Sequence, residues 1–256
     1  MNQYKLSVVT ISKNNCNGLH QTLESVSSQD YPMIEHIVID GLSDDGSKEL
    51  LFSFIHSKEY YYTSSKDNGI SDAFNKGLTK SCGDLILFLN SGDTLFSSNT
   101  VSKVIDSYST HKWKCAVGGV VRLNPKGEEV YIPPTISSYF LRFFMFLPHQ
   151  GFFCEISLHK KFRFDESIKT SMDYDLFLRM LKGTKICYLD FIVSVLEPGG
   201  VSSDTAKRVS EQSCIRLVHS HNVLMRLTVR LINLLIYLKY HLKIGSPFSV
   251  QSPRDM

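Results

Sequence analysis

The sequence predicts an α/β fold with a mainly parallel sheet flanked by helices, and two observations carry this prediction. Along the first half of the chain, apolar runs typical of buried strands alternate with segments whose apolar residues recur every three or four positions. One run, residues 85–89, has five consecutive large apolar side chains, which suits a strand covered by helices on both faces. Alternating strands and helices require right-handed crossovers, and therefore parallel strand pairing.

The first half contains the strands and helices that make up this parallel sheet. We expect strands at 6–11, 34–40, 60–63 and 85–89, and helices marked by Leu19, Leu23 and Val26, by Leu50, Leu51, Phe54 and Ile55, and by Ile70, Ala73, Phe74 and Leu78. Polar loops follow the strands at 12–15, 40–47, 66–69 and 90–93. Because the carboxyl ends of parallel strands meet at one edge, these loops form a single rim, where open α/β sheets bind ligands.

The second half has a mixed, partly antiparallel pattern. We expect a helix at 101–108, strands at 115–123 and 129–132 joined by a turn at 124–127, a helix that begins near Asp173, and short strands at 184–189 and 192–196. The apolar stretch 139–147 is either a buried helix or a surface for a lipid-linked partner, and burial is favoured because most such runs are core. Two helices are expected from residue 204 onward.

The last of these helices, near 224–242, combines leucines on one side with basic residues on the rest. The leucines are Leu227, Leu231, Leu234, Leu235, Leu238 and Leu242, and the basic residues are Arg226, Arg230, Lys239 and Lys243. Such a helix either docks on the domain or lies in a membrane interface, and the basic residues favour anionic lipid. Both interpretations stay open.

Length and composition exclude several classes of protein. A chain of 256 residues has room for one main domain with a tail, and its net charge of +3 is too small to indicate a nucleic-acid partner. Its six cysteines form no CxxC pair, so neither a zinc site nor a disulfide framework is expected. No apolar run is long enough to span a bilayer. We therefore expect a cytoplasmic protein, either soluble or peripheral on the inner face of the membrane.

Carboxylates at the predicted rim suggest chemistry. Asp93 ends the Asn90-Ser91-Gly92-Asp93 cluster after a buried strand, and Asp40 ends another strand. Asp93 can ligate Mg²⁺ or Mn²⁺ and so hold a diphosphate, while Asp40 can accept hydrogen bonds from a nucleotide base or ribose. The same residues are also ordinary turn formers, so both interpretations stay open. For a general base we choose Asp173, because His149 would serve only if it stayed neutral and close.

Five blocks of the chain, in this order, resemble the inverting GT-A glycosyltransferases of family 2. They lie at 7–14, 37–47, 67–77, 83–93 and 172–179, and the resemblance covers about residues 5–200. It implies a GT-A fold and transfer of a sugar from a nucleotide diphosphate sugar, expected to be a UDP-sugar, with Mn²⁺ or Mg²⁺ as cofactor. The acceptor it implies is a saccharide, expected to be lipid-linked, in the synthesis of surface polysaccharide.

The resemblance also implies a role for individual residues. The nucleotide would be held by Thr10, Ile11, Ser12, Asn14 and Asp40, the diphosphate and sugar by Asp67, Asn75, Lys76, Asn90, Ser91 and Gly92, and the metal by Asp93. Asp173 would be the general base, with His149, Gln150 and Asp175 on the acceptor side. The implied organisation is a catalytic domain at 1–203, divided into a nucleotide-binding half at 1–97 and an acceptor-binding half at 98–203, followed by a helical extension at 204–256 with 224–244 as a membrane contact.

Two departures from the family pattern leave alternatives open. Where the family often has Asp-x-Asp-Asp, residues 90–93 carry one carboxylate, and Gly92 offers no side chain to a ribose. Met172 replaces the Glu that precedes the base, and Asp175 is an alternative base, although Asp173 fits the register of the motif. The runner-up function is a module that binds nucleotide sugar without transferring it. A nucleotidyltransferase and a dinucleotide oxidoreductase are disfavoured because no glycine-rich phosphate loop follows the first strand.

Overall fold

The computed structural model describes residues 4–54, 59–124, 127–198 and 205–241. Its strands are β1 (Leu6–Ser12), β2 (Ile34–Asp40), β3 (Glu59–Ser64), β4 (Leu85–Phe88), β5 (Thr94–Leu95), β6 (Cys115–Asn124), β7 (Gly127–Tyr131), β8 (Phe152–Glu155) and β9 (Ile186–Leu196). Its helices are α1 (Cys16–Ser27), α2 (Ser47–Phe54), α3 (Ile70–Lys80), α4 (Thr100–His111), α5 (Ile156–His159), α6 (Met172–Met180), α7 (Thr205–Val218) and α8 (Val223–His241), with short 3₁₀ helices η1 (Ser138–Arg142) and η2 (His149–Gly151).

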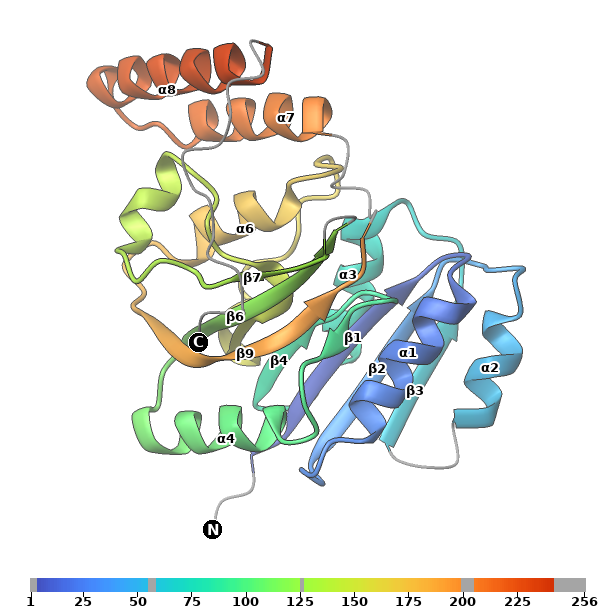
Figure 1. Ribbon diagram of the computed structural model, residues 1–256. Helices are drawn as coiled ribbons and strands as arrows, with labels where there is room; N and C mark the ends of the chain where they lie inside the picture. The colour runs from blue at the N-terminus through green and yellow to red at the C-terminus, as the bar shows by residue number, and fades with distance from the viewer. Residues whose placement is uncertain (1–3, 55–58, 125–126, 199–204, 242–256) are drawn as a thin grey trace.

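One sheet runs through the molecule in the order β3-β2-β1-β4-β8-β6-β9-β5, with β7 paired to β6 (Figure 1). The first four strands in this order pair in parallel. Strand β8 is antiparallel to both β4 and β6, while β6 and β9 are parallel. The predicted α/β fold, parallel in its first half and mixed in its second, is confirmed. The predicted halves 1–97 and 98–203 share this one continuous sheet.

Both faces of β4 are covered, as its apolar run predicts. Leu85 and Leu87 lie in a core cluster that includes residues of α4, whereas Ile86 and Phe88 lie in a second cluster with residues of α3 and α6. A smaller cluster joins α1 and α2 to β2. Because side chains alternate along a strand, a run without polar residues feeds both clusters at once. This burial fixes the carboxyl end of β4, where Asp93 follows.

Two predictions for the second half need correction. A single strand, β9, replaces the short strands expected at 184–189 and 192–196, and its pairing with β6 absorbs register shifts around Gly119 instead of breaking. The stretch 139–147 forms only a turn of 3₁₀ helix at its start. Its side chains then divide: Leu141, Phe146 and Leu147 are buried, whereas Tyr139, Phe140 and Phe144 are exposed. A helix would have required one continuous buried face, which this stretch lacks.

The two predicted C-terminal helices are present. Helix α7 packs against α6, and α8 lies on α7 at the far side from the parallel sheet (Figure 1). Among the described residues, no helix has the length and hydropathy required to cross a membrane. Residues 242–244 of the predicted membrane contact, including Lys243, lie outside the described residues.

Candidate active site

Three of the polar loops, 12–15, 40–47 and 90–93, are joined by hydrogen bonds at the carboxyl edge of the parallel strands. The N–H of Gly41 donates to the carbonyl of Ser12 at 2.9 Å, and the N–H of Asn14 donates to Ser43 Oγ at 2.8 Å. The N–H of Ser91 donates to the carbonyl of Ile11 at 3.1 Å. Asn14 sits in the left-handed region at φ 51°, which turns the chain back toward the next loop. The rim is therefore one bonded unit.

Asp40 and Asp67 organise the part of the rim that faces β2 and β3. Asp40 is fully buried, and its carboxylate accepts from the N–H of Ser43 at 3.1 Å and from Ser64 Oγ at 2.6 Å. Asp67 approaches the backbone of Gly41 so closely that a Cβ there would lie 2.5 Å from its Oδ2. An alanine at position 41 would therefore force the Asp67 carboxylate to shift. Both carboxylates hold loops in place, and only Asp67 retains partial exposure.

Three residues expected to bind donor have other partners. Thr10 is fully buried and its Oγ1 lies 2.9 Å from His36 Nε2, inside the sheet. The amide of Asn75 bonds the backbone of Phe164 in both directions, at 3.0 Å each. Lys76 Nζ pairs with Asp72 at 3.1 Å and donates to the carbonyl of Lys66 at 2.9 Å. These side chains are thus bonded within the protein, and a role for them in donor binding stays a prediction.

Asp93 lies almost fully buried among donors from three parts of the chain. Its Oδ2 accepts from Gln150 Nε2 at 3.1 Å, and its Oδ1 accepts from the N–H of Glu197 at 3.0 Å. The carboxylate of Glu197 accepts from Asn15 Nδ2 at 2.9 Å. Burial raises the pKa of Asp93 to about 6, and the charge of Glu197 adds to this. Two carboxylates thus share this side of the rim.

Gly92 explains how Glu197 reaches Asp93. Its φ of +95° is in the region that favours glycine, and a Cβ at this position would lie 1.8 Å from Glu197 Oε2. Because Gly92 has no side chain, the carboxylate of Glu197, which follows β9, fits beside the 90–93 loop. The sequence motifs did not single out Glu197. Its position could have indicated it, because Glu197 directly follows the predicted strand 192–196, just as Asp93 comes shortly after the predicted strand 85–89.

His149 lies beside Gln150 in an aromatic environment. Its ring centroid is 5.2 Å from that of Phe74, 5.6 Å from Phe88 and 6.0 Å from Phe164. Burial lowers the pKa of His149 to about 4, so the imidazole is neutral at pH 7. A histidine can act as a base only if it is neutral and close to the reacting group, and His149 meets the first condition. Its ring lies between the segment that carries Gln150, helix α3 and the loop before α6.

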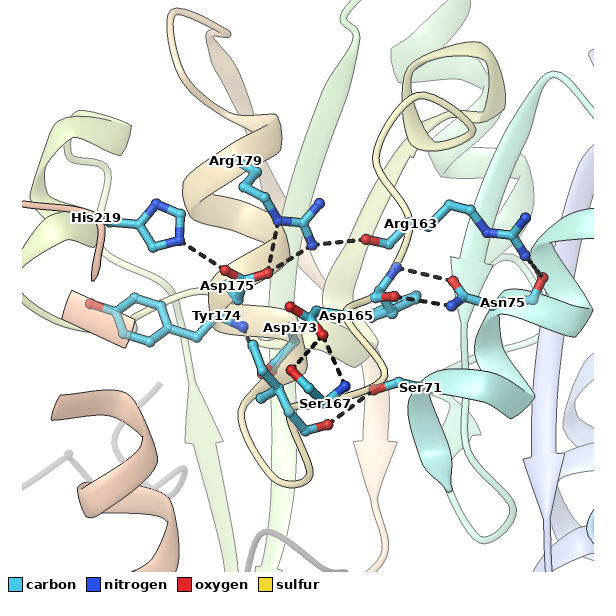
Figure 2. Close-up of polar contacts among 12 residues, drawn as sticks. Ser71, Asn75, Arg163, Asp165, Ser167, Asp173, Tyr174, Asp175, Arg179 and His219 are labelled. Carbon is cyan, nitrogen blue, oxygen red and sulfur yellow. Dashed lines mark hydrogen bonds and ion pairs between the residues drawn. The ribbon is translucent and has the colours of Figure 1, made fainter. Parts of the chain in front are cut away.

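Asp173 and Asp175 begin α6, and the structure separates their roles. Asp173 is partly exposed, its Oδ1 accepts from the N–H of Tyr174 at 2.8 Å, and burial raises its pKa to about 6. Within the described residues, Asp173 has no ion-pair partner. Asp175 instead pairs with Arg179 at 2.7 Å and His219 at 2.8 Å (Figure 2). Burial opposes this pairing, yet the two partners hold the pKa of Asp175 below its usual value. Asp175 is therefore a link between helices, and Asp173 is the carboxylate that stays available.

Asp173 belongs to the same rim through the segment that precedes it. Ser71 Oγ donates to the carbonyl of Ile168 at 3.2 Å (Figure 2). A Cβ on Gly69 would lie 3.9 Å from Lys169 Nζ. The segment before α6 therefore crosses the start of α3, next to the 66–69 loop.

Four buried polar atoms around the rim lack hydrogen-bond partners within the described part of the chain. They are Ser12 Oγ, Asn90 Oδ1, His149 Nε2 and Ser171 Oγ. Buried polar groups are nearly always paired, so a cluster of unpaired ones marks a place where a polar ligand completes the bonding. Asp93 and Glu197 add oxygen ligands of the kind that Mg²⁺ and Mn²⁺ prefer when they also bind phosphate oxygens. Over the ranges that the structure describes, no group of three or more His, Cys, Asp or Glu side chains is placed to hold a metal ion, so a cation at this rim would have these two carboxylates and phosphate oxygens as its ligands.

Comparison with known proteins gives a consistent result. The glycosyl transferase family 2 model matches residues 7–164. Two proteins of Mycobacterium tuberculosis, the uncharacterized glycosyltransferases MT1564 and Rv1514c, are each 32% identical over 184 residues, which covers 68% of this chain and 68% of each relative. TuaG of Bacillus subtilis, a glycosyltransferase named for teichuronic acid biosynthesis, is 31% identical over 90 residues, or 34% of this chain and 36% of TuaG.

Solved structures show the same fold. S. aureus TarS 1–349 in complex with UDP-GlcNAc aligns with a TM-score of 0.71 at 17% identity, covering 94% of this chain and 73% of TarS. Glucosyl-3-phosphoglycerate synthase from Mycobacterium tuberculosis, with Mn²⁺, UDP and glucosyl-3-phosphoglycerate, aligns with a TM-score of 0.60 at 14% identity, covering 84% and 80%. The α/β sheet described above is thus a GT-A fold. With the family model matching more than half of the sequence, this chain belongs to glycosyl transferase family 2.

Proposed function

We propose that this protein transfers a sugar from a UDP-sugar to a saccharide hydroxyl with inversion at the anomeric carbon. One observation supports the proposal: among the described residues, polar atoms of Ser12, Asn90, His149 and Ser171 are buried without hydrogen-bond partners, in the segments that also carry Asp93 and Asp173. This arrangement suits a donor bound through its diphosphate at one side and attacked from the other. A UDP donor is supported by the UDP-GlcNAc and UDP bound to two neighbours of the same fold.

Each residue of the rim has a defined chemical task in this proposal. Asp173 takes the proton from the acceptor hydroxyl, and its raised pKa, near 6, keeps it ionised yet basic at neutral pH. Asp93 and Glu197 would hold the divalent cation, with Gln150 fixing the orientation of Asp93. Such a cation, when bound, neutralises charge on the departing nucleoside diphosphate. The rings of Phe74 and Phe88 pack around His149 and keep its imidazole away from solvent.

The test of this proposal is the replacement Asp173→Asn. A general base contributes about 10²- to 10⁴-fold in rate, so we expect release of UDP from UDP-sugars in Mn²⁺ to fall by that factor. Donor binding, measured by thermal stabilisation with UDP and Mn²⁺, should stay unchanged because Asp93 and Glu197 are untouched. Asp190→Asn, at an exposed position, is the matched control and should keep full activity. Unchanged turnover in Asp173→Asn would reject the assigned base.

A module that binds nucleotide sugar without transfer is the second candidate, suggested by the single carboxylate of residues 90–93. Glu197 restores a second carboxylate beside Asp93 and so weakens this candidate. Donor binding with no UDP release in the wild-type protein, across a panel of UDP-sugars with saccharide acceptors, would establish it. NMR of the product anomer would test the inversion.

We also propose that α8 contacts an anionic membrane, where a lipid-linked acceptor would be found. Helix α8 buries Met225 and Val229 against α7, while six leucines at helical spacing remain 40–76% exposed: Leu224, Leu227, Leu231, Leu234, Leu235 and Leu238. By the 100° rotation per residue, these leucines lie on the side away from the buried pair. Residues 212–254 contain no Asp or Glu, so the cations beside this face have no acidic residues near them in sequence. Cations around an apolar face favour anionic lipid and disfavour a second copy of the same positive helix.

Flotation with vesicles tests this contact. We expect the wild-type protein to bind vesicles containing phosphatidylglycerol better than pure phosphatidylcholine vesicles. The triple variant Leu227→Ser, Leu231→Ser, Leu234→Ser should lose binding, and Phe52→Ser, exposed on the distant α2, should keep it. Equal binding by the triple variant would refute the proposal, and so would a dimer in light scattering that the triple variant abolishes.

A further inference from the structure

The supporting carboxylate that the family motif places before the base is missing from this chain. Met172 occupies that position, and its side chain is 6% exposed in the core cluster that includes Phe177 and Met180. An apolar side chain buried there stabilises the start of α6 but offers no charge and no hydrogen-bond acceptor. The start of α6 must therefore be held by something else.

Glu211 of α7 bonds the segment that leads into α6. Its Oε1 accepts from the N–H of Lys169 at 2.9 Å, and its Oε2 accepts from the N–H of Thr170 at 2.8 Å and of Ser171 at 2.7 Å. The hydroxyl of Thr170 adds a fourth bond at 2.5 Å. One carboxylate thus binds three consecutive backbone N–H groups. Although burial opposes it, this bonding holds the pKa of Glu211 below its usual value, so the group is charged.

These bonds matter because they end two residues before Asp173. Ser171 is the N-cap of α6, yet its side chain makes no capping hydrogen bond. The segment is fixed at its other end by α3, through Ser71 on the carbonyl of Ile168 and Asn75 on Phe164 (Figure 2). Glu211 therefore supplies the second anchor, and the direction in which Asp173 leaves the segment depends on it.

We infer that Glu211 is a positioning residue for the transfer reaction: from α7 it fixes residues 169–171 beneath Asp173 and supplies the negative charge that Met172 lacks. This inference rests on the proposed function of Asp173. It makes α7 part of the catalytic unit, although α7 lies beyond the family match at 7–164 and in the predicted extension 204–256.

The charges near Asp173 come from three elements. Arg208 and Glu211 on α7 act on the pKa of Asp173. Asp175 and Arg179 on α6 and Asp165 in the preceding segment lie in the same close-up (Figure 2). Asp175 and Arg179 pair with each other. After burial, which dominates, Glu211 raises the pKa of Asp173 and Arg208 lowers it. Replacing these two residues should therefore move the ionisation of the base in opposite directions.

The decisive experiment compares Glu211→Gln with His219→Gln. Glutamine has one acceptor oxygen where the carboxylate uses two, so the 169–171 segment loosens and the charge is lost. We expect Glu211→Gln to lower kcat about 10- to 100-fold, because small misplacements of a reacting group have effects of this size. The donor KM should stay unchanged, and the acid limb of kcat/KM should move to lower pH. His219→Gln removes the bond that the residue after α7 makes to Asp175 of α6, so it should lower the melting temperature but leave the acid limb in place.

Thr170→Val gives a test that keeps the carboxylate of Glu211 and its three backbone bonds but removes the hydroxyl bond to it. It should lower kcat, less than Glu211→Gln does, and leave the acid limb in place, and it is informative even if Glu211→Gln fails to fold. The inference is overturned if Glu211→Gln keeps the wild-type kcat and acid limb, if it behaves like His219→Gln, or if Thr170→Val keeps the wild-type kcat. Full turnover in Asp173→Asn would instead contradict the proposed function, so the two failures are distinguishable.

Discussion

The replacement Gly92→Ala tests the geometry of the Asp93 side of the rim. An alanine at φ +95° is strained, and its Cβ would lie 1.8 Å from Glu197 Oε2 and 2.9 Å from Glu197 Cβ. Glu197 must therefore move, which removes the bond from Asn15 and weakens the bond from its own N–H to Asp93. Backbone strain costs about 1–2 kcal/mol and the disturbed hydrogen bonds about as much again, so we expect a loss of about 3 kcal/mol in the free energy of unfolding.

Thermal melting measures this loss, and a second glycine separates strain from displacement of Glu197. For a chain of this size, about 3 kcal/mol corresponds to a decrease of about 6–12 °C in Tm. Gly183 has φ +77°, and no atom lies within 4 Å of the position that an alanine Cβ would take there, so Gly183→Ala should show the strain alone. Stabilisation by UDP with Mn²⁺ should also fall in Gly92→Ala and persist in Gly183→Ala. Equal melting temperatures and equal stabilisation for the two variants would refute the assignment of Glu197 to the site.

Three further outcomes follow from the same residues. The kcat/KM profile should fall as pH drops through about 6, because protonation of Asp173 removes the base; a profile flat to pH 5 would contradict this. Chelator should abolish UDP release, and added Mn²⁺ should restore it. Glu197→Gln should raise about tenfold the Mn²⁺ concentration that gives half-maximal UDP release. The same Mn²⁺ requirement in this variant and in the wild-type protein would count against Glu197 as a ligand. Three histidines have pKa values lowered by burial: His36 to about 3, His149 to about 4 and His159 to about 3. With chelator present, the unfolded chain gains three protons on these histidines below pH 6.5, whereas the folded protein gains two, on Asp93 and Asp173, near pH 6. The unfolded state therefore binds about one proton more than the folded state. The free energy of unfolding should thus fall by about 1.4 kcal/mol per pH unit between pH 6 and 4. A melting temperature that rises on acidification would contradict the sign.

The rim shows how sequence motifs and side-chain roles diverge. Thr10, Asn75 and Lys76 occupy motif positions, yet their polar atoms bond His36, Phe164 and Asp72. A motif records which residue stands at a position, whereas its role depends on which groups the fold brings within about 3 Å. Asp175 illustrates this, because this carboxylate, two residues from Asp173, bonds Arg179 and also His219, which follows α7.

Local pattern was sufficient for the parallel half of the sheet and for the polar loops, with Asp40 and Asp93, that follow its strands, because alternation and burial act over neighbouring residues. It failed where partners come from distant parts of the chain. Glu197 reaches Asp93 across a sequence separation of 104 residues, and Glu211 reaches Ser171 across 40. The sequence by itself determined the four parallel strands, the helices between them and the carboxylates Asp40 and Asp93 that follow two of these strands. Only the tertiary structure decided which of them are free to react and which hold loops, because hydrogen bonding and desolvation depend on neighbours in space.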